Sequence, residues 1–524
     1  MTNRRSFVAS AIIAFVVGLP ALAAAQDTRY IVKFRAGRRP AGHAALRTAG
    51  AQVVLALDAQ EAAAVRIPEA ALNGLSRNPN IEYIEPDVLR EPYATWSNTS
   101  VGGEVLPYGI QMVQADKISA PNAGAVTLCI IDSGYSQQHS DLKDTVSSST
   151  TTGTGTWNKD SCGHGTHVAG TVAAVAGNST GVIGANPGVS LHIVKVFGND
   201  SLVEDGSCTW TYSSTLVAAL NACRTNGADV VSMSLGGGAR SRTEENAFNS
   251  ANAAGVLSIA AAGNAGNNTT SYPAGYNSVM SVAAVDANEV KASFSQVNKD
   301  VEIAAPGVAV LSTTPWVDDN SLASSAGTWS GGRIEGAARG TVNGALIDGG
   351  RCTAASASWS GKVVLCQRGD ISFADKVNNV RTGGGVAAVV YNLAASDPTC
   401  GVYSGTLGTG VTSPIRAITL SCSDGAAAVA AAGAAGTVTS TFVAPSSGYE
   451  AWDGTSMATP HVSAVAALVW SCDPNKSNQQ VRNALTDTAL DKGPARRDTS
   501  YGYGIVQAKA ALQLLGLGSC TIKP

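Results

Sequence analysis

The chain has 524 residues, with 35 Lys and Arg against 38 Asp and Glu, and a net charge of −3. This balance excludes the basic surface that a nucleic-acid-binding protein normally presents. Only 14% of the residues are charged and 44% are hydrophobic, which predicts a folded protein of several domains rather than a disordered chain. The 57 glycines follow no three-residue period, so a collagen-like fibre is also excluded.

The first 25 residues have the three parts of a secretory signal peptide. Arg4 and Arg5 precede the apolar stretch Phe7–Leu22, and small alanines follow at 23 to 25. We expect cleavage after Ala25 and secretion of a protein that keeps no membrane anchor. An uncleaved anchor is the alternative, although the apolar stretch is shorter than the roughly 20 residues of a membrane span. The paired arginines also fit a twin-arginine signal, so the export route stays open.

The region from Arg29 to Val88 has the pattern of a small α+β module. Strand-like runs at Tyr30–Phe34 and Ile81–Glu85 enclose two helical stretches and a further strand near residues 53–55. A polar segment from Arg90 to Gly103 follows, and we expect it to be a linker open to proteolysis.

The next region repeats a unit of buried strand, loop and helix. Apolar runs at 126–131, 191–196, 230–234 and 256–261 alternate with helical patterns at 164–175, 214–224 and 244–254. This alternation predicts an α/β fold of three layers, with a mainly parallel sheet between two layers of helices. Ligands of such sheets bind at the carboxyl ends of the strands, so the residues after each run are candidate site residues.

A Gly- and Ser-rich stretch from 318 to 361 interrupts this pattern. A compact piece follows it, with strands at 362–366 and 386–391 and helices at 372–381 and 424–435. An inserted domain over residues 317–447 accounts for the change. Helical patterns then resume at 456–470, 477–490 and 506–515.

The ten cysteines of an exported protein predict disulfides. No CxxC pair is present, which disfavours a zinc ribbon. The sequence does not fix the connectivity. The simplest local hypothesis joins Cys208 to Cys223, Cys352 to Cys366, Cys400 to Cys422 and Cys472 to Cys520, and leaves Cys129 and Cys162.

Two ionisable residues stand at positions where chemistry is expected. Asp132 follows the apolar run Leu128–Ile131, although a lone Asp there is equally a turn or cap residue. His164 lies between glycines at the start of a predicted helix, where a buried histidine is the alternative. His164 and His167 lack the spacing and the intervening Glu of a helical zinc pair, which disfavours a metal centre.

Two polar residues add to this set. Ser456 precedes the apolar helix and is either an N-cap or a nucleophile at the helix N-terminus. Ala458 stands where the nucleophile elbow of an α/β-hydrolase requires Gly, which disfavours that fold. Asn264 closes the run Ser258–Asn264 and is either a turn former or an amide donor to an oxyanion.

Three segments together carry a family resemblance. Ile131–Gly134, His164–Gly170 and Gly454–His461 resemble the three active-site motifs of subtilisin-like serine proteases, the subtilases. Their order of Asp, His and Ser differs from that of chymotrypsin-like and α/β-hydrolase enzymes. The resemblance implies a secreted serine endopeptidase that hydrolyses peptide bonds through an acyl-enzyme and matures from a zymogen by cutting itself.

The resemblance also implies a role for each site residue. Ser456 is the nucleophile, His164 the general base and acid, and Asp132 the residue that orients the imidazole. Asn264 and the backbone N–H of Ser456 form the oxyanion hole. The substrate-binding residues are Ser234, Leu235, Gly236 and Gly237, along which an extended peptide pairs, and Ala261, Ala262 and Gly263, which wall the side-chain pocket. The small pocket residues imply broad, apolar-leaning selectivity.

The flanking regions resemble other parts of subtilase precursors. We expect a signal peptide at 1–25, a ferredoxin-like inhibitory propeptide at 26–95, and a catalytic domain at 96–316 and 448–524. Residues 361–369 and 373–376 are similar to a protease-associated domain, expected at 317–447, with a role in substrate access or, alternatively, as a spacer. The partners implied are protein substrates and the chain's own propeptide, with the enzyme a monomer.

The resemblance implies no cofactor for catalysis and a structural calcium ion. Its ligands would be Glu104, Asp141 and Asn178, because calcium prefers oxygen ligands. Cys129 precedes Asp132 and Cys162 precedes His164, which suggests a disulfide that pins the triad; two unpaired buried cysteines are the alternative.

Two functions of other classes stay open at this point. One is a catalytically silent binding scaffold, and the other is a signalling or adhesion protein built around the inserted domain. Both predict binding that does not depend on Ser456. The natural substrate and the maturation site, between about residues 90 and 106, do not follow from the sequence.

Overall fold

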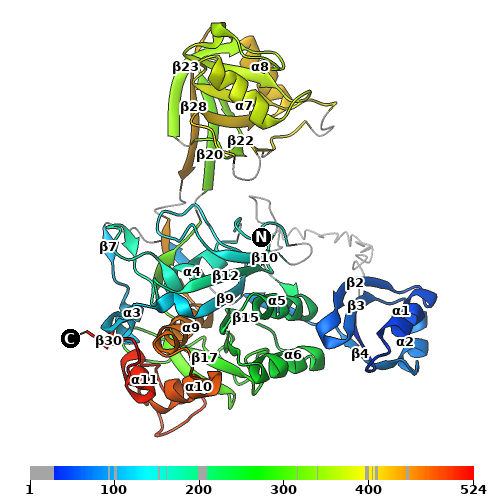
Figure 1. Ribbon diagram of the computed structural model, residues 1–524, viewed down its shortest axis with the longest axis vertical. Coiled ribbons are helices and arrows are strands. Elements are labelled where there is room, and N and C mark those ends of the chain that lie inside the picture. Colours follow the sequence, from blue (N-terminus) through cyan, green and yellow to red (C-terminus); the bar gives the residue numbers. More distant parts are fainter. Residues whose placement is uncertain are drawn as a thin grey trace, which may run out of the picture. The chain divides into compact units, whose positions relative to one another are not determined.

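The computed structural model describes residues 29–523 except 93–94, 99–102, 151–153, 161, 199–207, 209, 316, 339, 396–399, 404, 408–410 and 444–447. The predicted signal peptide at residues 1–25 lies outside the described residues. The chain forms two compact units, one up to Asp87 and one from Val88 onward, and each is described by itself (Figure 1). Within the described ranges, no helix combines the length and the apolar character needed to cross a bilayer.

The first unit is a four-stranded antiparallel sheet with two helices. Its strand order is β2-β3-β1-β4, and its elements are β1 (Arg29–Phe34), α1 (Arg39–Thr48), β2 (Gln52–Leu57), β3 (Ala62–Arg66), α2 (Glu69–Ser76) and β4 (Ile81–Pro86). This βαββαβ arrangement is the ferredoxin-like fold, so the predicted α+β module is confirmed. The strand β3 was not predicted, because its three alanines give no alternating pattern.

The second unit is built on a seven-stranded parallel sheet. Its strand order is β10-β12-β9-β14-β16-β17-β18. The strands are β9 (Thr127–Asp132), β10 (Ser147–Thr150), β12 (Ser190–Lys195), β14 (Val230–Met233), β16 (Leu257–Ala261), β17 (Val279–Val285) and β18 (Val301–Pro306). The predicted parallel sheet is confirmed, as are the four predicted strands, which are β9, β12, β14 and β16. The pattern did not predict β10, β17 or β18.

Helices cover both faces of this sheet. They are α4 (His164–Ala173), α5 (Ser213–Thr225), α6 (Arg242–Ala253) and α9 (Thr455–Ser471). Leu128 and Ile130 of β9 share one hydrophobic cluster with α9, whereas Cys129 between them forms a disulfide with Cys223 of α5. Because neighbouring strand residues point to opposite faces, α9 and α5 lie on opposite sides of the sheet.

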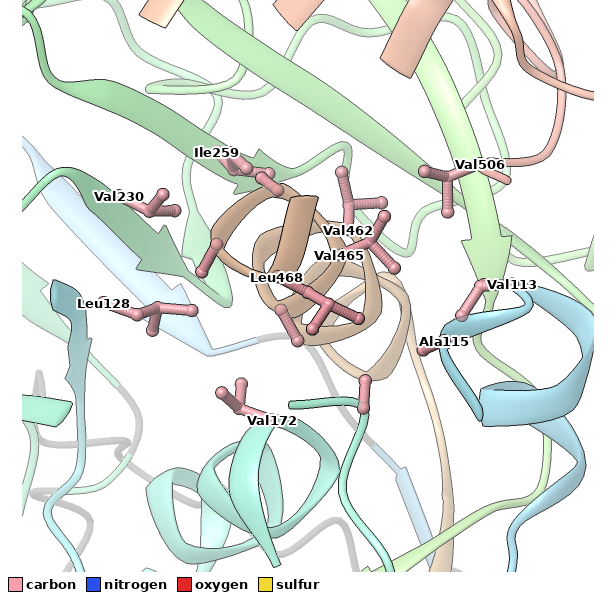
Figure 2. Packing of buried hydrophobic residues seen from close by; sticks show 14 of the residues in the cluster. Val113, Ala115, Leu128, Val172, Val230, Ile259, Val462, Val465, Leu468 and Val506 are labelled. Carbon is pink, nitrogen blue, oxygen red and sulfur yellow. The ribbon is translucent and has the colours of Figure 1, made fainter. Parts of the chain in front are cut away.

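The helix α9 is the centre of the core (Figure 2). Every residue from Thr455 to Ser471 is buried, and α9 lies between residues of the strands β9, β14 and β16, Val172 of the helix α4, and Val506 of the same hydrophobic cluster. Burying one such aliphatic side chain contributes about 1.5–3 kcal/mol. The packing therefore fixes the N-terminal end of α9 firmly against the sheet.

Shorter elements complete this part of the unit. They are β5 (Leu89–Pro92), β6 (Thr95–Asn98), β7 (Glu104–Val105), α3 (Tyr108–Met112), β8 (Ile118–Ser119), β11 (Gly181–Val182), β13 (Thr211–Tyr212), β15 (Leu235–Gly236), β19 (Val310–Thr313), β29 (Tyr449–Asp453), α10 (Asn478–Asp487), α11 (Ala508–Leu515) and β30 (Thr521–Ile522).

Residues from Val317 to Val443 contain a nine-stranded sheet with hydrophobic clusters of its own. Its order is β21-β20-β28-β23-β24-β25-β27-β22-β26. The elements are β20 (Val317–Ser324), β21 (Gly327–Ser330), β22 (Gly332–Glu335), β23 (Gly340–Asp348), β24 (Lys362–Gln367), α7 (Phe373–Thr382), β25 (Ala387–Tyr391), β26 (Gly405–Thr406), β27 (Arg416–Leu420), α8 (Cys422–Ala430) and β28 (Ala435–Val443). The Gly- and Ser-rich stretch thus forms strands; β20 and β23 each pair with a neighbour in the sequence and also with the distant strand β28.

The disulfides correct part of the predicted pairing. Cys352–Cys366, Cys400–Cys422 and Cys472–Cys520 are as expected, but Cys129 pairs with Cys223 and Cys162 with Cys208. The hypothesis of a Cys129–Cys162 bridge, and that of a Cys208–Cys223 bridge, are therefore wrong. Residues 129 and 132 are an odd number of strand positions apart, so their side chains point to opposite faces of the sheet. Cys129 therefore faces α5, and Asp132 points to the other face.

Candidate active site

Asp132 and His164 meet at the carboxyl edge of the parallel sheet. Asp132 is the last residue of β9 and His164 the first of α4, and Nδ1 of His164 lies 2.7 Å from Oδ1 of Asp132. Both side chains are buried. Nε2 of His164 is also buried and has no hydrogen-bond partner among the described residues, so it is the ring nitrogen that remains for proton transfer.

A polar network that the sequence did not reveal holds this pair. Ser133 Oγ accepts from the N–H of Gly165 and donates to the carboxylate of Asp160. That carboxylate also accepts from the backbone of Gly163 and from both the N–H and the hydroxyl of Thr166. Asp160 therefore caps α4 and fixes where the helix begins. Its position shortly before the histidine motif was the only signal that could have identified it.

Trp452 connects the histidine to the segment that leads to the serine. The indole of Trp452, on β29, stacks on His167 with centroids 4.6 Å apart and lies 6.3 Å from the ring of His164. Burial lowers the pKa of His167 to about 3, so this second histidine stays neutral at physiological pH. The strand β29 ends at Asp453, directly before the turn into α9.

Ser456 is fixed to the end of the strand beside β9. Its Oγ donates to the backbone oxygen of Ser234 at 2.8 Å, and Oγ of Ser234 donates to the backbone oxygen of Ser456 at 2.7 Å. Ser234 follows β14, and β14 pairs with β9, which ends in Asp132. The serine and the carboxylate thus belong to adjacent strand ends, as the sequence predicted.

Asn264 follows the third neighbouring strand, β16. Its Oδ1 accepts hydrogen bonds from the backbone N–H and the hydroxyl of Thr455, at 2.9 and 2.8 Å. Since the side-chain oxygen is held by two donors, the amide Nδ2 is the group left to donate. Asn264 is therefore fixed to Thr455, the residue before Ser456, through its side-chain oxygen.

The predicted substrate strand carries a partner from the same chain. Leu235 and Gly236 of β15 pair antiparallel with Pro92 and Glu91 of β5, and β13 pairs with the other side of β5. We expected an open linker here, but Leu89–Pro92 forms a strand. A second strand, β6, pairs antiparallel with β29. Residues 89–92 thus pair with the strand that follows Ser234, and residues 95–98 pair with the strand that ends shortly before Ser456.

Comparisons with known proteins identify the family of the chain. The model of the subtilase family matches residues 123–335 and 392–504. The chain belongs to the subtilase family. The PA domain model matches residues 341–428 of this subtilase, and the fervidolysin N-terminal prodomain model matches residues 29–87. The subtilase is thus a serine endopeptidase with a prodomain and an inserted PA domain.

Individual relatives support the same assignment. Subtilisin DY of Bacillus licheniformis is 45% identical over 218 residues, which are 40% of this chain and 76% of that protein. M-protease of Shouchella clausii is 38% identical over 255 residues, 48% of this chain and 61% of that protein. The subtilisin-like protease Apa1 of Pseudoalteromonas sp. AS-11 is 38% identical with a TM-score of 0.51, over 78% of this chain and 97% of that one. Fervidolysin of Fervidobacterium pennivorans shares the fold, with 22% identity, a TM-score of 0.59, and coverage of 93% of this chain and 61% of that one.

The predicted pocket residues of the subtilase lie at the end of β16. Ala261 and Ala262 are buried, and Ala262 packs in a cluster with Ala283 and Val285. Gly263 has a φ of +109°, and a Cβ there would lie 2.7 Å from Cγ of Gln296. The glycine therefore allows both the turn before Asn264 and close packing against Gln296.

The three predicted calcium ligands of the subtilase are brought to one loop. Oε1 of Glu104 accepts from the N–H of Gly177 and of Asn178, and Oδ1 of Asp141 accepts from Nδ2 of Asn178 at 2.7 Å. Burial raises the pKa of Asp141 to about 6, and the charge of Glu104 adds to this shift. The carboxylate oxygens are of the type that calcium prefers, but Asn178 turns its Nδ2 toward Asp141, and its Oδ1 accepts from the N–H of Thr180. Among the described residues, no group of three or more His, Cys, Asp or Glu side chains is arranged so that it could hold a metal ion.

Proposed function

We propose that the subtilase is exported, cuts itself during maturation, and then hydrolyses proteins through the triad Asp132, His164 and Ser456. The observation that carries the proposal is the position of β5 and β6. The strand β5 pairs with β15, directly after Ser234, and β6 pairs with β29, directly before the turn to Ser456. An extended peptide that runs past the serine in this way has the geometry of a bound substrate.

The reaction begins with proton transfer from Ser456. Nε2 of His164 accepts the proton of Oγ as Oγ attacks the peptide carbonyl carbon. The 2.7 Å hydrogen bond from Nδ1 to Asp132 keeps the imidazole in the required tautomer and stabilises the imidazolium that forms. The serine hydroxyl must leave its bond to the Ser234 oxygen for this step.

The developing oxyanion is held by Nδ2 of Asn264 and the N–H of Ser456, at the N-terminus of α9. When the carbon–nitrogen bond breaks, His164 returns the proton to the leaving amine and an ester to Ser456 remains. Water then adds to this acyl-enzyme with His164 as base, which releases the new carboxylate and restores the serine.

The registers of the two strands limit where maturation occurs. The strand β5 ends at Pro92 and β6 begins at Thr95, which supports our proposal that Ser456 cuts its own chain between these two residues. N-terminal sequencing of the secreted enzyme should give a start at residue 93, 94 or 95. A start far beyond 95, in enzyme protected from further digestion, would contradict this register.

We also propose that calcium binds at Glu104, Asp141 and Asn178 and stabilises the loop around them. A cation would compensate the two neighbouring carboxylates. Addition of EGTA to the Ser456→Ala protein should lower its melting temperature by several degrees, and Asp141→Asn should abolish this response. An equal response in the Asp141→Asn protein would refute the site.

The main proposal is tested by Ser456→Ala. This variant should be secreted as the uncleaved precursor and should not cut a protein substrate. The matched control is Ser463→Ala, a second buried serine on α9, whose hydroxyl bonds to Ser232 away from the site; it should still mature. If Ser456→Ala matured and cleaved without added protease, the nucleophile would be wrong and the alternatives of a binding scaffold would also fail.

A further inference from the structure

A buried ion pair lies on the path of the strand β5. Arg90 is fully buried, between the exposed residues Leu89 and Glu91. Its Nη2 lies 2.9 Å and its Nε 3.3 Å from Oε1 of Glu244, and neither side chain has any exposed surface. Arginine and glutamate are seldom buried completely unless they form such a pair. The inward side chain of the added strand therefore enters an acidic pocket.

The pocket belongs to the catalytic domain. Glu244 lies in the first turn of α6, where its N–H bonds to the hydroxyl of the N-cap residue Ser241. The hydroxyl of Tyr276 bonds to both the N–H and the oxygen of Ser241. Burial, and then the charge of Glu244, raise the pKa of Tyr276, so its hydroxyl stays protonated. The helix N-terminus and these donors keep Glu244 in place.

Glu244 is thus held independently of the propeptide. Its supports, Ser241 and Tyr276, belong to the part of the chain that remains when residues before 93 have been cut away. Once Arg90 is removed, Glu244 loses its guanidinium partner, and a peptide that again covers this carboxylate would bury its charge without the cation that compensates it here. Covering this carboxylate with an uncharged side chain would be costly.

We infer that Glu244 makes the mature subtilase select substrates with an arginine at the position that Arg90 occupies. In the propeptide strand Pro92 pairs with Leu235, so this arginine stands two residues before the substrate residue that takes the place of Pro92. This inference rests on the proposed function, because it takes β5 as the path of a substrate. It adds a charge requirement that the small, apolar pocket residues at 261–263 do not supply.

The contacts favour arginine over lysine. Nε and Nη2 of Arg90 share Oε1 of Glu244, while Nη1 donates to the backbone oxygen of Leu89 at 2.7 Å. A lysine ammonium cannot make this set of contacts, since it is a point charge without the planar fork. Gly237 leaves room for the fork, because a Cβ there would lie 3.2 Å from Nη1.

The experiment uses mature enzyme and quenched peptides that differ only at one position, with Arg, Lys or Leu. The arginine is also moved along the peptide, so that its distance from the cut is read directly. We expect kcat/KM for the Arg peptide to exceed that for the Leu peptide by about 10²-fold, with Lys between them. Glu244→Gln should reduce this ratio to below about 3-fold, whereas the neighbour Glu245→Gln should keep it.

Three variants separate selectivity from folding. Arg90→Leu yields the same mature protein as the wild type once cleaved, so it should slow maturation and leave the peptide ratio unchanged. If the Glu244→Gln protein does not accumulate, the double variant Glu244→Leu with Arg90→Leu is used instead. It replaces the buried ion pair by two neutral side chains, so that the precursor can still fold and mature. A wild-type enzyme that cuts both peptides equally, or a Glu244→Gln enzyme that keeps the preference, would overturn the inference. Failure to cut any peptide would instead contradict the proposed function.

Discussion

Two buried carboxylates in this subtilase are paired with basic side chains, and the difference between the pairs is instructive. Asp132 bonds to His164 at 2.7 Å, and Glu244 bonds to Arg90 at 2.9 Å. Imidazole gains and loses a proton near neutral pH, whereas guanidinium keeps its charge at every relevant pH. The first pair can move a proton, and the second can only hold a charge.

The environment of each pair matches this difference. Asp132 and His164 are held by backbone and side chains of one domain, whereas Arg90 reaches Glu244 from a strand that maturation separates from the enzyme. On the proposed function, similar burial would produce chemistry at one place and recognition at the other. Changes at the first pair should lower kcat, and changes near the second should alter KM and selectivity.

The largest effect is expected at the proton-moving pair. Asp132→Asn keeps the shape of the side chain but favours the wrong imidazole tautomer, so kcat should fall by about 10⁴-fold. The variant must be matured by added wild-type enzyme, which is then removed, and assayed for kcat on a peptide substrate. Activity within tenfold of the wild type would contradict the role of Asp132.

A smaller loss of catalytic rate is expected for Asn264→Ala. Removing this oxyanion donor should lower kcat by about 10²–10³-fold, with little change in KM, because the contact is made in the transition state. The Arg-over-Leu preference should persist. Asn267→Ala, an exposed neighbour, is the control. If the loss appeared in KM alone, Asn264 would be binding substrate rather than the oxyanion.

The substitution Gly237→Ala tests whether a substrate follows the path of β5. A Cβ at this position would lie 2.5 Å from the backbone oxygen of Leu89, so it should hinder the added strand and raise KM by about 10-fold while kcat is retained. Gly238→Ala is the matched control, since a Cβ there meets nothing within 4 Å. Equal kinetics of the two variants would show that substrate does not follow the path of β5.

The smallest effect concerns His139, a buried histidine that must stay neutral in the folded protein. Burial lowers the pKa of His139 to about 4, although its bond to the oxygen of Gly448 opposes this shift. Below pH 6.5 the unfolded chain binds a proton that the folded state excludes, so stability falls as the pH drops toward 4. Relative to Ser456→Ala alone, the additional change His139→Gln should relieve about 1 kcal/mol per pH unit below 6.5. If the plots of melting temperature against pH were parallel for the Ser456→Ala protein and the Ser456→Ala, His139→Gln protein, this prediction would be wrong.

The candidate site residues could be found in the sequence because each lies beside a local signal. Asp132, Ser234 and Asn264 stand at the ends of the apolar runs of β9, β14 and β16, and these neighbouring parallel strands bring the ends together. Sequence analysis failed where a residue pairs with another that lies far away in the sequence. Arg90 stood in a polar segment and was taken for linker, since nothing near it indicates that Glu244 would bury it. The alternation of faces along β9, which the motif alone does not reveal, likewise misdirected the pairing of Cys129.

The most direct test of the account is covalent labelling of the mature enzyme with a peptidyl fluorophosphonate, followed by mass spectrometry of the digested protein. We predict one adduct, on Ser456, formed in parallel with loss of activity and absent in His164→Ala. An adduct on another serine, or full activity after complete modification of Ser456, would contradict the account.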